Sequence, residues 1–339
     1  MSITRLTFAL LTSCILLVSC GGSGDDTGGS STEQPASVTA TTAAWTIADV
    51  PVAPGVAMAN RYPRAQIDFP GGVVGLPDLV YSQVNGYRQL RLDMYLPPDR
   101  STTHPMVMYI HGGGWQGGHS RQSGAFEDWP STLAMIASRG YVVTSINYRL
   151  GGEEPFPAAI QDVKTALRWL RANAAEFGID KENFLVWGAS AGGHLAGLAG
   201  TSCGVTELEP VNLPDELAAE SDCVQATIGW YGIYDLAEMG EGGGPGGYFA
   251  GQLTAASPAT YVDATDGSFL LIHGSTDPVI DYQQSVDFNE LLMANGVPSN
   301  LHIIPDVAHS YIGTTAESTK AASILALEMS LAFMDEVLQ

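Results

Sequence analysis

Residues 184–194 read FLVWGASAGGH, and this stretch indicates the fold class. Its first four residues are large and apolar, which predicts a buried strand, and the small residues after Ser190 are compatible with a helix. Glycines on both sides of Ser190 suit a tight turn between the two, because glycine adopts backbone conformations that other residues avoid. A strand that turns directly into a helix is typical of a parallel α/β sheet, and it places Ser190 at the carboxyl edge of that sheet.

The rest of the chain alternates strand and helix patterns in the same way. Short apolar runs predict strands at 90–96, 106–110, 141–148, 184–187, 226–231, 269–273 and 301–304. Several are apolar on both faces, as strands covered by helices on both sides must be. Apolar residues three and four positions apart predict one helix across 160–177, ended by Gly178, and a last helix is expected at 316–337. We therefore predict a mostly parallel, doubly wound sheet with helices on both faces, in one domain over residues 61–339.

The N-terminal segment differs from this domain in composition. Its apolar run at 6–18 has the length of a signal-peptide core and is too short for a permanent transmembrane helix, so residues 1–19 are expected to be a signal peptide. The run ends in LVSC followed by glycine, which resembles a bacterial lipobox and would make Cys20 a lipidated residue; a simple secretory signal is the alternative. Residues 20–60 are expected to form a flexible tether. The prediction is an exported protein, lipid-anchored at a bacterial cell envelope, in the periplasm or at the outer membrane or surface.

Charge excludes one class of partner. The chain has 14 Lys and Arg against 36 Asp and Glu, a formal net charge of −22. Such a surface repels the phosphates of nucleic acids and the headgroups of anionic membranes. We expect no nucleic-acid partner, and contact with a membrane only through the lipid anchor.

Cys203 and Cys223 are the two cysteines beyond the N-terminal segment. In an exported protein they favour a disulfide across the acidic, proline-containing stretch 204–222, and two buried free thiols are the alternative. No further cysteine or closely spaced histidine completes a tetrahedral zinc site, so no metal is expected.

A second glycine cluster follows the predicted strand at 106–110 and reads HGGGW at 111–115. Consecutive glycines allow the backbone to turn its N–H groups toward a substrate oxygen. The amides of Gly113 and Gly114, together with that of Ala191 after the serine, are therefore candidates for an oxyanion hole. A flexible glycine loop without this role is the alternative.

These motifs carry a family resemblance. In order they are LRLDMYLP, HGGGW, NYRL, FPAAIQDVKTALRWLRANAAEFGID, GASAGGH, HGSTDPVI and VAHSY, and they cover most of residues 88–310. The chain resembles α/β-hydrolases, specifically the hormone-sensitive-lipase-like esterases and the carbohydrate- and feruloyl-esterase-like group. The resemblance implies the α/β-hydrolase fold with small cap insertions. Ala189, where lipase-like members often carry an acidic residue, favours the second group.

This fold supplies its catalytic residues in the order serine, acid, histidine. Ser190 is the expected nucleophile. His309, in a short loop after the last predicted strand, is the expected general base, and Asp277, a short loop after the strand at 269–273, is the acid expected to orient it.

Three other aspartates compete for the acid's place. Asp281 lies where a helix should begin and is expected to be an N-terminal or first-turn acid that favours the helix dipole. Asp235 follows the strand at 226–231, a second position from which such folds sometimes supply the acid. Asp306 is too close to His309 in sequence to reach back without strain.

The function expected is a serine carboxylesterase that forms an acyl-enzyme on Ser190 and needs neither metal nor organic cofactor. Short-chain esters, or esters linked to saccharides or aryl groups, are the expected substrates, with Trp115 as a candidate pocket residue. The stretches 204–222 and 238–252 are expected to cap the pocket. An amide or formamide hydrolase, or a non-catalytic binding protein on the same fold, is the alternative.

Overall fold

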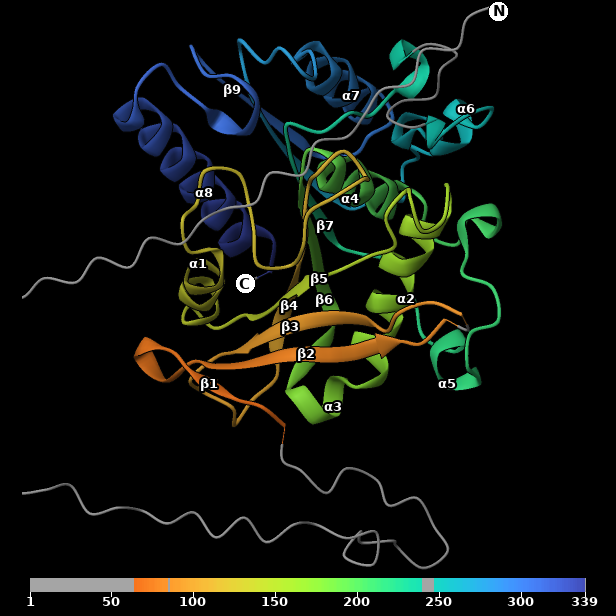
Figure 1. Cartoon of the computed structure of the whole chain (residues 1–339), viewed down its shortest axis with the longest axis vertical. Coiled ribbons are helices and arrows are strands. Elements are labelled where there is room, and N and C mark those ends of the chain that lie inside the picture. Colours follow the sequence, from red (N-terminus) through yellow and green to blue (C-terminus); the bar gives the residue numbers. More distant parts are fainter. Residues whose placement is uncertain (1–63, 85, 240–246, 339) are drawn as a thin grey trace, which may run out of the picture. The chain divides into compact units, whose positions relative to one another are not determined.

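The computed structural model describes residues 64–84, 86–239 and 247–338 (Figure 1). The predicted signal peptide at 1–19 and the tether at 20–60, with Cys20, lie outside the described residues. No helix in the described part combines the length and the apolar character needed to cross a membrane.

One nine-stranded sheet organises the described residues. Its strands in chain order are β1 (Ile67–Asp68), β2 (Val74–Ser82), β3 (Leu90–Leu96), β4 (His104–Ile110), β5 (Val142–Ile146), β6 (Ile179–Ala189), β7 (Ala226–Trp230), β8 (Ser268–Gly274) and β9 (Ser299–Ile304). They lie in the order β1-β2-β3-β5-β4-β6-β7-β8-β9. Strands β4 to β9 are parallel, and β1 to β3 extend the sheet with antiparallel pairs. The predicted mostly parallel α/β sheet is confirmed.

Helices cover both faces of this sheet. The α-helices are α1 (Trp129–Ala137), α2 (Ala158–Ala172), α3 (Ala174–Phe177), α4 (Ala191–Thr201), α5 (Asp215–Ala218), α6 (Leu253–Ala256), α7 (Gln283–Ala294) and α8 (Ala316–Leu338). Figure 1 shows α1 and α8 on one side of the strands and α2 and α4 on the other. Short 3₁₀ turns lie at η2 (Pro70–Gly72), η3 (Thr206–Leu208), η4 (Leu236–Met239), η6 (Pro258–Thr260) and η7 (His309–Tyr311).

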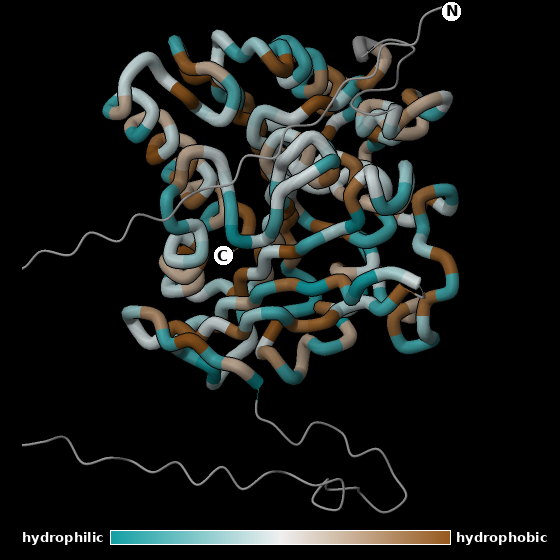
Figure 2. Tube along the Cα trace, viewed as in Figure 1, coloured by the Kyte–Doolittle hydropathy of each residue, from teal (hydrophilic) through white to brown (hydrophobic). Residues whose placement is uncertain are grey.

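Neighbouring residues of the central strand β4 show why both faces need a helix layer. Met108 packs in a buried cluster with Leu167 of α2 and Leu195 of α4. Val107, on the other face, packs in a cluster with Phe333 of α8. In Figure 2 hydrophobic residues recur along the inner strands. A strand that is apolar on both faces is stable only when both are covered.

One expectation about an individual element was wrong, and two strands were not predicted. The helix expected across 160–177 is two helices, because the chain leaves helical geometry at Asn173 (φ −99°, ψ 13°), whose side-chain amide donates to the carbonyl of Trp169. Gly178 ends the second helix in a left-handed conformation (φ 67°), as expected. Strands β1 and β2 were not predicted, since Pro77 and Asp78, with φ 58° at Asp78, interrupt the alternation of β2.

The acidic stretch 204–222 is closed by a disulfide and held to α2 by buried charges. Cys203 and Cys223 are bonded, with their Cα atoms 4.8 Å apart. Lys164 of α2 is fully buried and donates to Glu209 at 3.0 Å, to the carbonyl of Ser202 at 2.6 Å and to Asp222. A buried ammonium group is tolerated only with such partners, so this network fixes the stretch against the helix.

Candidate active site

Ser190 lies at the sharp turn between β6 and α4. Its backbone angles (φ 57°, ψ −120°) are unusual for a residue with a side chain, and such strain concentrates at functional sites. Neighbouring glycines permit the turn: a Cβ atom at Gly188 would come within 2.0 Å of the Gly192 carbonyl oxygen, and one at Gly192 within 2.0 Å of the Ile110 carbonyl oxygen. The Ser190 amide donates to the Trp230 carbonyl at 2.9 Å, which fixes the turn to β7.

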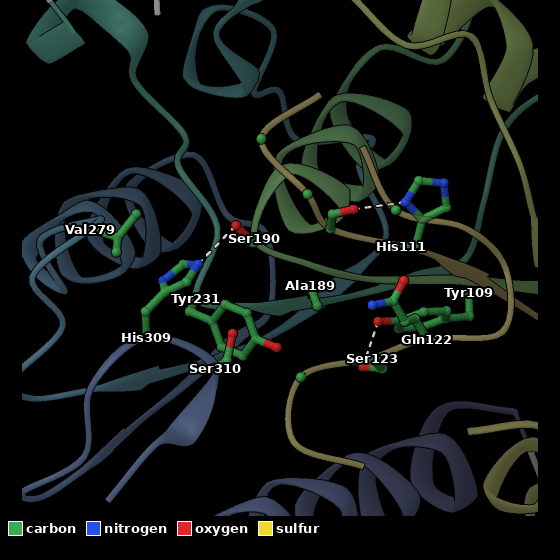
Figure 3. Close-up of a pocket in the computed structure, with 15 residues that line it drawn as sticks. Tyr109, His111, Gln122, Ser123, Ala189, Ser190, Tyr231, Val279, His309 and Ser310 are labelled. Atoms are coloured by element: carbon green, nitrogen blue, oxygen red, sulfur yellow. Dashed lines mark hydrogen bonds between the residues drawn. The ribbon is translucent and has the colours of Figure 1, made fainter. Parts of the chain in front are cut away.

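The three residues predicted as a triad form one hydrogen-bonded chain. Ser190 Oγ donates to His309 Nε2 at 2.9 Å (Figure 3). His309 Nδ1 in turn donates to Asp277 Oδ2 at 2.6 Å. They come from the turn after β6, the loop after β9 and the loop after β8, and parallel strands bring these carboxyl ends to one edge of the sheet. Ser190 is therefore next to a base that is itself oriented by a carboxylate.

Asp277 is a buried carboxylate with four hydrogen-bond donors. Its Oδ1 accepts from the amides of Val279 (2.8 Å) and Ile280 (3.0 Å), and its Oδ2 accepts from His309 (2.6 Å) and His273 (3.1 Å). Burial alone raises the pKa of Asp277, but the hydrogen bonds from His273, from His309 and from the two amides outweigh it and hold this pKa well below its ordinary value. Asp277 is therefore ionised at neutral pH.

The competing aspartates have other partners. Asp281 Oδ1 accepts from the amide of Gln283, as a residue at a helix start does. Asp235 Oδ1 accepts from the amide of Ala237, and the amide of Asp306 donates to Ser275 Oγ. In the described residues the hydrogen-bonded partner of His309 Nδ1 is Asp277.

The glycine loop after β4 borders the same cavity as Ser190. Gly113 and Gly114 have φ values of 120° and 59°, and a Cβ at Gly113 would come within 2.3 Å of the Gly117 carbonyl oxygen. Ala191 begins α4, where the first amides have no partner within the helix. The backbone donors predicted for an oxyanion hole thus border Ser190 from two elements.

His111 shapes this loop. Its Nδ1 lies 2.7 Å from the Gly112 carbonyl, its ring stacks on Tyr148 with centroids 4.4 Å apart, and its own carbonyl accepts from the Tyr148 hydroxyl at 2.9 Å. Burial lowers the pKa of His111 to about 4, so the ring is neutral at neutral pH.

The prediction that Trp115 lines the substrate pocket is wrong. Trp115 has φ 58°, directly after the left-handed Gly114, and this turn directs its side chain into the core, where it is 3% exposed. Its Nε1 donates to His194 Nδ1 at 3.2 Å, and its ring meets the edge of Phe249 with centroids 4.7 Å apart. His194 is fully buried in α4, behind the turn at Ser190. Trp115 therefore packs in the core and supports the glycine loop from inside the protein.

The cavity at Ser190 has a volume of about 430 Å³. Figure 3 shows Ser190, His309, Tyr231 and Ala189 around it, with a wall that the sequence patterns did not predict. This wall comes from the segment between β4 and α1 and from the two loops that carry Asp277 and His309; its residues are Gln122, Ser123, Gly124, Val279 and Ser310. The lining contains no Lys, Arg, Asp or Glu in the described residues, which suits uncharged substrates.

Asp93 of β3 anchors the part of this wall that follows β4. Its carboxylate accepts from Arg121 Nε at 2.7 Å and from Ser120 Oγ at 3.0 Å, immediately before Gln122. Asp93 lies within the LRLDMYLP motif, but the sequence does not identify Ser120 and Arg121 as its partners.

Two further predictions concern the surroundings of the cavity. The stretch 204–222 was expected to cap the pocket, but its described residues supply no side chain to the lining of the cavity. The disulfide and Lys164 hold this stretch against α2 instead. Residues 240–246 of the second stretch lie outside the described residues. In the part that the structure describes, no three His, Cys, Asp or Glu side chains are grouped to bind a metal ion.

Comparison with known proteins gives consistent matches. Residues 92–292 match the model of the BD-FAE family. Esterase LipQ of Mycobacterium tuberculosis is 30% identical over 70% of this chain and 58% of its own length, and Carboxylesterase NlhH of the same organism is 30% identical over 67% of this chain and 73% of its own. The chain spans less than two thirds of LipQ and of two further curated relatives, Esterase LipC and the probable carboxylic ester hydrolase LipM, of which it covers 52% and 60%.

Solved structures agree with these relatives. A truncated carbohydrate esterase from gut microbiota is 26% identical, with a TM-score of 0.63, over 78% of this chain and 99% of its own. Esterase 2 of Thermogutta terrifontis with bound propionate is 25% identical, with a TM-score of 0.67, over 79% of this chain and 95% of its own.

Proposed function

Since this chain belongs to the BD-FAE family, we propose that it is a serine carboxylesterase in which Ser190 is the nucleophile, His309 the general base and Asp277 the acid. The observation that carries the proposal is the hydrogen-bonded chain Ser190–His309–Asp277 beside backbone amides at the cavity. Relatives named esterase or carboxylesterase support the same reaction class.

The reaction proceeds in two acyl transfers. His309 Nε2 accepts the Ser190 proton as Oγ attacks the ester carbonyl carbon, and the imidazolium then gives this proton to the departing alcohol oxygen. Water repeats the sequence on the acyl-enzyme: it gives a proton to His309, attacks the carbonyl, and Ser190 recovers its proton as the carboxylic acid leaves. Asp277 stabilises the imidazolium in both steps.

The oxyanion of each tetrahedral intermediate is proposed to bind to the amides of Gly113, Gly114 and Ala191. Each such donor contributes about 3 kcal/mol to the lowering of the barrier, because it is already oriented before charge develops. The tight contacts that only glycine permits at Gly113 support this role.

Short carboxylic esters are the proposed substrates, with esters on saccharides or aryl alcohols as the natural class. A cavity of about 430 Å³ whose wall carries hydroxyl and amide groups suits a small acyl group better than a long alkyl chain. A carbohydrate esterase among the similar structures supports the saccharide-linked class.

The wild type is expected to hydrolyse p-nitrophenyl acetate and butyrate at least about tenfold faster, in kcat/KM, than the octanoate, because the hydroxyl and amide groups of the wall give a longer alkyl chain little apolar surface to bind. Methyl ferulate tests the aryl class in the same assay. The matched p-nitroanilide of acetic acid is the control for reaction type. An enzyme that cleaves the anilide and none of the esters would instead be an amide hydrolase.

We also propose export and lipid anchoring through Cys20, on the strength of the LVSC sequence before glycine. A mature N-terminus at Cys20 carrying acyl groups is expected when the full chain is expressed in a bacterial host and its intact mass is measured. An unmodified N-terminus at any other residue would remove this proposal and leave the esterase proposal intact.

A further inference from the structure

A second histidine contacts the acid of the proposed triad. His273 lies near the end of β8, and its side chain is fully buried. Its Nε2 is 3.1 Å from Asp277 Oδ2 and 3.1 Å from the carbonyl oxygen of Ile280, and its Nδ1 is 2.7 Å from Ser285 Oγ of α7. Asp277 Oδ2 therefore lies between two imidazole rings, those of His273 and His309.

The neighbours of His273 determine where its proton lies. A carboxylate and a carbonyl both accept hydrogen bonds and carry no hydrogen, so Nε2 must be the protonated nitrogen that donates to them. The Ser285 hydroxyl can donate, and it completes the arrangement by donating to Nδ1. All three contacts are satisfied by one neutral tautomer.

Asp277 depends on this donor because it has no cationic side chain beside it. Among the described residues, the basic side chains within 4 Å of its carboxylate are His273 and His309, and neither a lysine nor an arginine lies there. Buried carboxylates are costly unless donors surround them, and here two backbone amides hold Oδ1 while the two histidines hold Oδ2. Without His273, one of the two donors that fix the position of Oδ2 is lost.

We propose that His273 is a positioning residue of the active centre: by donating from Nε2 it fixes Asp277 Oδ2 where His309 Nδ1 needs it and takes up part of the carboxylate charge. This inference rests on the proposed roles of Ser190, His309 and Asp277. His273 acts through Asp277 and does not line the cavity.

Two substitutions separate this role from a packing role. In His273→Gln the terminal amide nitrogen reaches about as far as Nε2 and keeps a donor, whereas His273→Leu fills similar space without one. We expect the leucine variant to lose about 10- to 100-fold in kcat/KM for p-nitrophenyl acetate, the loss expected for one hydrogen bond to a charged group, with KM nearly unchanged. The glutamine variant should stay within about threefold of the wild type.

The pH profile gives a readout that packing alone would not move. Without the His273 donor, more of the Asp277 charge is available to the His309 imidazolium, so the acid limb of kcat/KM should move to higher pH in His273→Leu and stay in place in His273→Gln. In the part of the chain that the structure describes, the titratable groups in contact with this pair are His273 from β8 and Tyr231 after β7, whose ring centroid is 4.8 Å from that of His309.

Ser285→Ala is the matched control, because it removes the Nδ1 contact and leaves the Nε2 contact to Asp277 in place; its pH profile should match that of the wild type. Equal losses in the glutamine and leucine variants, or a leucine variant with wild-type rate and profile, would overturn the role of His273. Should the leucine variant fail to fold, His273→Asn replaces it, since its shorter amide does not reach Asp277. A wild type without esterase activity would instead defeat the proposed function itself.

Discussion

Ser190→Ala is expected to lower kcat for p-nitrophenyl acetate by about 10⁶-fold, to the level set by oxyanion binding and contaminating hydrolysis, with the melting temperature unchanged. The variant removes Oγ, the atom proposed to form the acyl-enzyme, and keeps Cβ. Alanine has the same backbone restrictions as serine at φ 57°, so the turn between β6 and α4 gains no strain. A fluorophosphonate probe should add one adduct mass to the wild type and none to the variant.

Ser310→Ala is the matched control for this experiment. Ser310 follows the proposed base directly and lines the same cavity, yet its hydroxyl is not the atom within reach of His309 Nε2. Its loss should cost less than about tenfold. Loss of turnover in Ser310→Ala with retained turnover in Ser190→Ala would contradict the proposal, because it would place the nucleophile in the loop after β9 and not in the turn after β6.

The predictable part of this molecule is the part fixed by the ends of parallel strands. Ser190, Asp277 and His309 each follow an apolar strand by a short loop, and the parallel sheet brings these ends together whatever the loops do in detail. Chain order and residue type were therefore enough to group the three, and they favoured Asp277 over Asp235.

Side-chain direction was not predictable in the same way. Trp115 adjoins the glycine loop in sequence, but its positive φ turns the ring into the core. This backbone angle cannot be predicted from the residue type. His273 and Asp277 are four residues apart, and in the sequence this spacing indicates only a strand end followed by a short loop. The contact between their side chains was therefore not predicted. The wall at Gln122 belongs to an irregular segment held by Asp93 of a distant strand, and a hydrophobic period cannot detect such a link.

The predictions for the irregular elements failed for a related reason. Pro77 and Asp78 disrupt the period of β2, and the left-handed Asp78 amide donates to Asp93 Oδ1 at 2.9 Å. Tertiary contacts thus stabilise a strand whose local sequence argues against one. The break at Asn173 is the reverse case, in which a local side-chain hydrogen bond ends a helix whose apolar stripe continues.

Asp277→Asn is expected to lower kcat by about 10⁴-fold while the protein remains folded. Each oxygen of Asp277 faces two N–H donors, so either orientation of an asparagine amide directs its NH₂ group against hydrogens. With the NH₂ at Oδ2, His309 Nδ1 must become the acceptor. Its proton then lies on Nε2, facing Ser190 Oγ, and the imidazole can no longer take the serine proton.

Asp235→Asn and Asp281→Asn are the matched controls for the acid. Both are aspartates on neighbouring loops whose carboxylates accept from a local backbone amide and not from His309, so both variants should keep kcat within about threefold of the wild type. Steady-state kinetics on p-nitrophenyl butyrate, with melting curves for all three variants, measures this. Full activity in Asp277→Asn with loss in Asp235→Asn would move the acid to the loop after β7; the carboxylate at 2.6 Å from His309 Nδ1 argues for the opposite result.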